Sequence, residues 1–162
     1  QRDYKTLAAA TAKLAVDVHV SAFSSDARAL ARTLPERTPA NMDRRFYEWR
    51  DLVQLYRDAD LVVVPLRENR YAAGMASLLE GMAAGRPVIA TATAGLAGVF
   101  ADLEAIRWVP PGDASRLRAE ILSLLADDDA RDDLAARGAR LLAERHTENR
   151  MAEGMAARLR TL

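Results

Sequence analysis

The segment GMASLLEGMAA (74–84) carries a single charged side chain, Glu80, among Gly, Ala, Ser, Met and Leu residues. A carboxylate on such a smooth surface is partly removed from water, which is costly for a charge without partners. Hydroxyl groups or cations should therefore meet it. Two interpretations stay open: an ion pair with Arg86 or Arg70, or contact with a ligand that brings hydroxyls.

Helical periodicity, about 100° per residue, divides this segment into two faces. One face is expected to pack in the core and holds Met75, Leu78, Leu79, Met82 and Ala83. The opposite face holds Ala76, Ser77, Glu80, Gly81 and Ala84. The small residues on this second face predict that another element or a ligand comes close to it.

Gly74 lies at the start of the expected helix, where unpaired amides and the helix dipole favour a phosphate group. Glu80 follows six positions later, which corresponds to about 9 Å at about 1.5 Å per residue. That distance is about the reach from a diphosphate to a ribose, and a carboxylate can accept hydrogen bonds from ribose hydroxyls. Gly74 and Glu80 together predict a binding site for a nucleoside diphosphate.

The elements that must position these residues alternate between helix and strand patterns. Helices are expected over 4–14, 25–34, 48–59 (amphipathic through Leu52, Leu55 and Tyr56), 74–84, 114–126, 130–145 and 148–160. Strands are expected over 16–23, 42–46, 60–66 and 86–91, followed by a short strand and a turn over 105–113. The continuous apolar runs 60–65 and 87–91 are typical of central parallel strands. This order predicts an α/β domain that binds ligands beyond the carboxyl ends of its strands.

Bulk composition excludes several classes of protein. The chain has 162 residues, enough for one domain, and its 23 Lys and Arg balance its 23 Asp and Glu, which gives no support to nucleic-acid binding. It has no cysteine, and we expect no transmembrane segment, no signal peptide and a cytoplasmic location. Because QRDYKT is not a natural start, we expect a processed product or an excised fragment.

The segment GMASLLEGMAAGRPVIAT (74–91) resembles the signature of glycosyltransferase family 4, the group-1 retaining enzymes of the GT-B fold. DLVQLYRDADLVVVP (51–65) and the stretches 109–142 and 146–155 resemble further segments of that family. The resemblance implies a Rossmann-like parallel sheet flanked by helices, the C-terminal, donor-binding half of a GT-B fold. Residues 1–162 would form this single domain, with 148–160 as its closing helix and with the first strand and the N-terminal acceptor domain missing.

The resemblance also implies roles for individual residues. Glu80 matches the second glutamate of a paired motif and would hold the donor ribose, and Arg2 falls where a lysine usually neutralises the diphosphate. The loop whose amides meet the diphosphate corresponds to Gly74, Met75 and Ala76. The loop that borders the base corresponds to Tyr47, Glu48 and Trp49.

One position departs from the family pattern. The first glutamate of the motif, which contacts the donor sugar, should lie eight residues before Glu80, and that position is Ala72, with Glu68 as a possible substitute. The sugar of the donor is therefore undetermined. We expect the donor to be a UDP-, GDP- or ADP-sugar, and we expect no cofactor and no metal. The isolated chain is expected to be inactive without its N-terminal domain. The alternative is a nucleotide-binding Rossmann-like module without chemistry.

Several other motifs are expected to be structural. The DxD spacings at Asp58–Asp60 and Asp127–Asp129 resemble metal sites, but they fall at helix ends, where turn and N-cap roles are common. Asp113 is expected to cap a helix as well. The sequence GLAG (95–98) lacks the full dinucleotide-binding spacing, so a nicotinamide cofactor is disfavoured.

Overall fold

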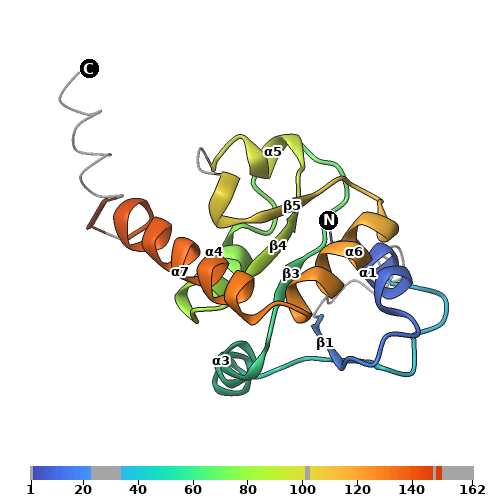
Figure 1. Ribbon diagram of the computed structural model, residues 1–162. Helices are drawn as coiled ribbons and strands as arrows, with labels where there is room; N and C mark the ends of the chain where they lie inside the picture. Colours follow the sequence, from blue (N-terminus) through green and yellow to red (C-terminus); the bar gives the residue numbers. More distant parts are fainter. Residues whose placement is uncertain (1, 23–33, 101–102, 148, 151–162) are drawn as a thin grey trace.

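The computed structural model describes residues 2–22, 34–100, 103–147 and 149–150. Among these, a three-stranded parallel sheet has the order β3 (Val62–Val64), β4 (Val88–Thr91) and β5 (Arg107–Val109) (Figure 1). The prediction of a central strand is confirmed for 87–91 and wrong for 60–65, because β3 is the end strand of this sheet. Just beyond β3, Leu66 forms an isolated antiparallel bridge with Arg2.

A second parallel pair joins β1 (Val18–Ser21) to β2 (Met42–Arg45), with Val18 opposite Met42. The helices are α1 (Tyr4–Thr11), α3 (Trp49–Asp58), α4 (Met75–Ala83), α5 (Ala94–Ala97), α6 (Ala114–Leu125) and α7 (Asp128–Arg145), with a short 3-10 turn at Leu103–Ala105. Neither α5 nor the 3-10 turn was predicted from the sequence. The helices expected at 25–34 and 148–160 fall almost wholly outside the described residues.

Both faces of the three-stranded sheet are buried, which explains the continuous apolar character of its strands. Ile89 and Val109 belong to a core formed with α1 and α6. Val62, Val64 and Val88 belong to a second core on α4, α5 and the C-terminal half of α7. The prediction of a Rossmann-like parallel sheet flanked by helices is therefore confirmed.

The orientation of α4 differs in part from the prediction. Leu78, Gly81 and Met82 are its buried residues, whereas Met75 and Ala83 are exposed. A Cβ atom at Gly81 would lie 3.0 Å from Val62 Cγ1, so Gly81 faces the sheet and permits close packing of the helix. Part of the small-residue pattern thus reflects helix–sheet contact rather than a ligand.

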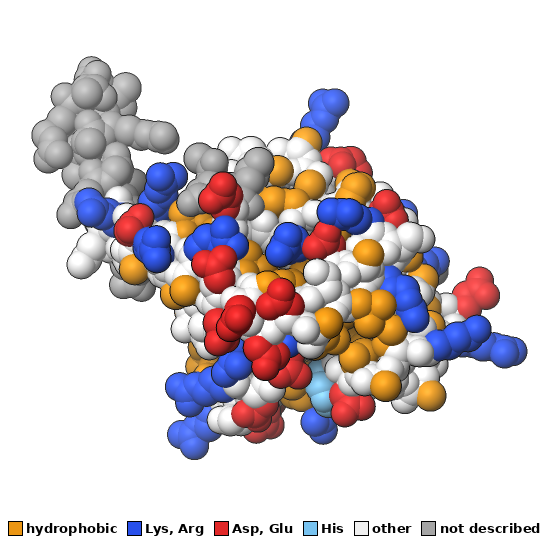
Figure 2. Space-filling model, viewed as in Figure 1, with side chains coloured by type: hydrophobic (Ala, Val, Ile, Leu, Met, Phe, Trp, Pro, Cys, Tyr) orange, Lys and Arg blue, Asp and Glu red, His pale blue; other side chains and the backbone are white. Residues whose placement is uncertain are grey.

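The surface carries interspersed charges of both signs, as Figure 2 shows for one face. This mixture agrees with the formal net charge of zero. No helix within the described ranges combines the length and the apolar character needed to cross a bilayer.

Candidate functional site

Arg2 lies at the carboxyl end of β3. Its bridge to Leu66 and the hydrogen bond from the Asp3 amide to the Pro65 carbonyl, 2.9 Å, fix the backbone there. Asp3 then begins α1 by accepting a hydrogen bond from the amide of Thr6. The N-terminal segment is therefore held at the sheet edge where α/β domains bind ligands.

The guanidinium of Arg2 reaches the first turn of α4. Its Nη2 donates a hydrogen bond of 2.6 Å to the hydroxyl of Ser77, and its Nη1 lies 3.0 Å from the position that a Cβ of Gly74 would take. A helix of nine residues leaves amides of its first turn without intrahelical acceptors. Positive charge and helix dipole therefore act at the same place.

Gly74 has a left-handed backbone conformation, φ 83°, which glycine adopts without strain. An added Cβ would also lie 2.7 Å from Val64 Cγ1. Glycine is thus required by conformation and by crowding from the protein itself, in addition to any ligand. The next amide, that of Met75, donates to the Ala72 carbonyl at 3.3 Å. The amide of Ala76 is therefore more available than that of Met75 as a hydrogen-bond donor to a ligand.

Glu80 lies on the half-buried side of α4, and its carboxylate accepts a hydrogen bond of 2.8 Å from the hydroxyl of Tyr56 in α3. Among the described residues, no ion pair includes Glu80. The interpretation that pairs it with Arg86 or Arg70 is therefore wrong: the phenol of α3 is the partner.

Tyr56 connects the groups of this site. Burial, followed by the hydrogen bond to Glu80 and its charge, raises the pKa of Tyr56 to about 12. A hydrogen bond with Ser77 and the charge of Arg2 act in the opposite direction. The four side chains Arg2, Ser77, Tyr56 and Glu80 therefore form one polar array across the outer side of α4, which we call the α4 array.

Ser77 and Tyr56 are the members of the α4 array that the sequence did not predict as site residues. Tyr56 belongs to the amphipathic pattern of 48–59, where it was interpreted as a packing residue. A polar partner for its hydroxyl could have been predicted, because a partly buried tyrosine normally finds a hydrogen-bond partner.

The segment expected to border a base divides into buried and exposed residues. Tyr47 is buried and donates a hydrogen bond to Asp43 at 3.2 Å, while its hydroxyl lies 3.2 Å from Nδ1 of His19. Glu48 is exposed at the N-cap of α3, and Trp49 is 66% exposed. Trp49 offers an indole surface, whereas the ring of Tyr47 is engaged within the protein.

The loop 67–73 is hydrogen bonded to α5 and packs against it. The carboxylate of Glu68 accepts hydrogen bonds of 3.1 Å from the amides of Asn69 and Ala94. A Cβ atom at Gly95 would lie 2.1 Å from the Tyr71 carbonyl oxygen, so only glycine allows this backbone contact. Gly95, which belongs to the GLAG sequence, thus has a packing role, and Glu68 has a role in capping α5.

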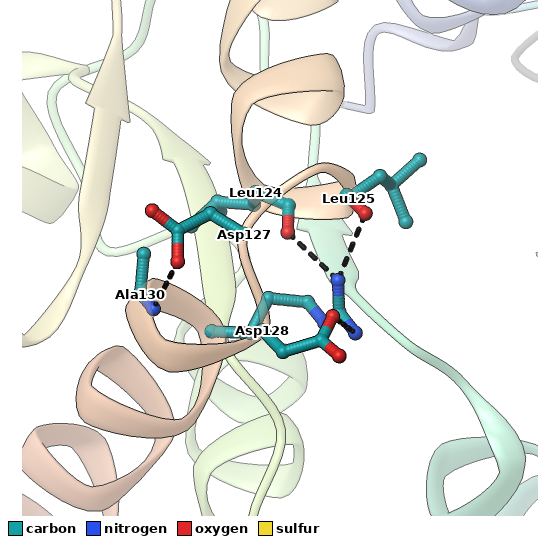
Figure 3. Close-up of polar contacts among 6 residues, drawn as sticks. Leu124, Leu125, Asp127, Asp128 and Ala130 are labelled. Carbon is teal, nitrogen blue, oxygen red and sulfur yellow. Dashed lines mark hydrogen bonds and ion pairs between the residues drawn. The ribbon is translucent and has the colours of Figure 1, made fainter.

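The acidic motifs take part in local structure. Asp127 caps α7 by accepting from the amide of Ala130 at 2.9 Å, and Arg131 donates to the Leu124 and Leu125 carbonyls (Figure 3). Asp58 accepts from Gln54. The described residues contain no cluster of three or more potential metal ligands. The predicted capping roles of Asp127 and Asp113 are confirmed.

The sequence pattern of the family described as "Glycosyl transferases group 1" matches residues 4–127. This match covers most of the chain. The chain belongs to the group 1 glycosyl transferases. No curated protein is significantly similar to it in sequence.

Solved structures of glycosyltransferases share this fold. A glycosyltransferase from Rickettsia africae is 17% identical with a TM-score of 0.77, and the similarity covers 97% of this chain and 45% of that one. HepE from Anabaena, in complex with UDP-glucose, is 18% identical with a TM-score of 0.72, over 97% of this chain and 44% of that one. Sucrose-phosphate synthase from Thermosynechococcus elongatus is 23% identical with a TM-score of 0.76, over 99% of this chain and 42% of that one.

At these identities the similarity shows the fold: a group 1 glycosyltransferase domain of the GT-B type. This chain spans less than half the length of each of the three solved proteins. Arg2 and Ser77 meet beyond the carboxyl end of β3, on the side of the sheet where α/β domains generally bind ligands.

Proposed function

We propose that this chain is the donor-binding domain of a retaining glycosyltransferase and binds a nucleoside-diphospho-sugar for transfer to an acceptor. The observation that carries the proposal is the hydrogen bond from Arg2 to Ser77, 2.6 Å, which holds a guanidinium beside the first turn of α4. A diphosphate there would meet a fixed positive charge, the helix dipole and the Ala76 amide. Family membership and the UDP-glucose complex of HepE support a nucleotide-sugar as the ligand.

The chemistry assigned to this site is stabilisation of the leaving diphosphate. Glycosyl transfer from such a donor releases a nucleoside diphosphate, and oriented donors lower the energy of the charge that develops on it. Arg2 and the start of α4 supply these donors from the protein, without a metal ion in the proposed mechanism. No protein nucleophile is assigned, and the acceptor would approach from the N-terminal domain.

The remaining residues are proposed to select the nucleoside. Glu80 would accept hydrogen bonds from the ribose hydroxyls, further along α4 than the diphosphate. Gly74 and Met75 would line the diphosphate path with their backbone. Trp49 and Glu48, both exposed at the start of α3, would border the base together with the more buried Tyr47.

Calorimetric titration of the 162-residue chain with UDP, GDP and ADP tests this proposal. One of these nucleotides should bind with one-to-one stoichiometry, and its affinity should be the same in EDTA as in Mg²⁺. The matching nucleoside without phosphates serves as the control and should bind more weakly. If none of the three nucleotides binds, the proposal is contradicted; a loss of affinity in EDTA contradicts its metal-independent form.

Ala72 favours a second candidate, a nucleotide-binding module without transfer chemistry. The family pattern has a sugar-contacting glutamate at this position, and the nearby Glu68 is engaged with the amide of Ala94. In that case nucleotide binding would persist while transfer is absent from a protein that also contains the N-terminal domain. Product formation by such a two-domain protein would exclude the module.

A further inference from the structure

The hydrogen bond between Tyr56 and Glu80 links α3 to α4. Tyr56 donates to Oε2 of Glu80 at 2.8 Å, from 24 positions earlier in the chain. The ring of Tyr56 packs against the core that contains Leu78 and Met82. Its hydroxyl therefore reaches Glu80 from an anchored base and not from a freely rotating side chain.

This contact constrains the carboxylate and still leaves it able to bind. An ionised carboxylate has two oxygens with about four acceptor positions. Among the residues that the structure describes, Tyr56 alone occupies an acceptor position, on Oε2, which leaves Oε1 and the other position on Oε2 for hydroxyl donors. A glutamate without such a contact would lose more rotamer freedom on binding a ligand.

Ser77 extends the contact toward the diphosphate end of the α4 array. Its hydroxyl accepts a hydrogen bond from Arg2, and its interaction with Tyr56 lowers the pKa of that phenol. Tyr56 is thus the member of the array that connects the cationic end to the carboxylate end.

We propose that Tyr56 is a positioning residue that holds the Glu80 carboxylate in the orientation that accepts the ribose hydroxyls. The inference rests on the proposed function, because it assigns Tyr56 a part in recognising the nucleoside diphosphate. It predicts that the Tyr56 hydroxyl increases the affinity only for nucleotides that carry ribose hydroxyls. It also predicts that this increase requires the Glu80 carboxylate.

The test compares Tyr56→Phe with the wild-type chain, using the nucleoside diphosphate that binds and its 2′,3′-dideoxy analogue. Removing one hydrogen bond should weaken binding of the ribonucleotide by about two- to tenfold. Binding of the dideoxy analogue should be unchanged. In a Glu80→Gln background, Tyr56→Phe should cause no further loss, since both changes act on the same contact.

Gln54→Ala is the matched control, because it removes an exposed hydrogen bond, to Asp58, from the same helix. Its affinity should equal that of the wild type, and thermal unfolding of Tyr56→Phe should show an intact fold, since the ring is retained. Equal ribonucleotide affinity of Tyr56→Phe and wild type, with Glu80→Gln weakened, overturns the positioning role and leaves the proposed function in place. An equal loss for the dideoxy analogue also overturns it, and an absence of binding by the wild type removes both proposals.

Discussion

Arg2 and Ser77 lie 75 positions apart in sequence and are joined by a hydrogen bond of 2.6 Å from the guanidinium to the hydroxyl. The backbone bridge of Arg2 to Leu66 anchors the donor, and the first turn of α4 positions the acceptor. The Arg2 guanidinium is therefore held beside the N-terminal end of α4, which already favours anions through its dipole.

Replacing Arg2 with Ala should weaken binding of the nucleoside diphosphate by roughly one to two orders of magnitude, because charge-assisted hydrogen bonds to phosphate contribute about 1.5–3 kcal/mol. Binding of the corresponding nucleoside should change little, since it carries no phosphate. Calorimetry on both ligands measures the difference. Arg140→Ala, which removes an exposed cation on α7, is the control. Equal losses for nucleotide and nucleoside would place Arg2 outside the diphosphate site.

Glu80→Gln keeps the shape of the side chain and removes its charge, so it should weaken nucleotide binding by roughly one to two orders of magnitude. A dideoxynucleotide should bind the wild type about as poorly, and the two losses should not add. Glu144→Gln, an exposed substitution on α7, should bind like the wild type. If Glu80→Gln binds UDP, GDP and ADP as well as the wild type does, the carboxylate serves the contact with Tyr56 alone.

The phenol of Tyr56 should ionise near pH 12, well above the ordinary tyrosine value of 10.0, because burial and the neighbouring Glu80 carboxylate disfavour its anion. A pKa raised in the folded state stabilises the fold below pH 10, and this contribution is lost as the pH rises from 10 toward 12. Ultraviolet titration of wild type and Tyr56→Phe measures the effect. An unchanged high-pH transition in the variant would contradict the assignment.

Gly95→Ala should destabilise the fold by about 1–3 kcal/mol or more, because the new methyl group would overlap the backbone of Tyr71. The same clash should separate α5 from the loop 67–73. Urea unfolding measures the free energy of unfolding. Gly98→Ala in the same region is the control, with its nearest atom at 3.1 Å and a φ of −68°, and should cost less. Similar stabilities for the two variants would show that the loop adjusts without cost.

The 162-residue chain should show no transfer of sugar from any nucleotide-sugar to an acceptor, because the proposed reaction takes place in a cleft between two domains. Product analysis by mass spectrometry, with UDP-, GDP- and ADP-sugars supplied, tests this expectation. A protein that also contains the N-terminal domain is the positive comparison. Acceptor-linked product formed by the chain alone would overturn it.

The sequence by itself determined the order and type of most elements. Continuous apolar runs predict the buried strands β3 and β4, since a strand covered on both faces has no polar side. Asp113 and Asp127 mark the starts of α6 and α7, because their carboxylates satisfy the first amides of a helix. The segment 74–91 indicated the family. The match of the family's sequence pattern to residues 4–127 confirms that resemblance.

The tertiary structure decided which residues meet across long separations. Periodicity placed Gly81 on the outer face of α4, but the crossing of the helix over Val62 turns it inward. The sequence left open an ion pair of Glu80 with Arg86 or Arg70 beside contact with a ligand, whereas the position of α3 supplies Tyr56 as a protein partner. The contact of Arg2 with Ser77 likewise depends on the pairing of Arg2 with Leu66. A side-chain contact between distant segments depends on how whole helices pack, and helical period reports only the residues that share a face.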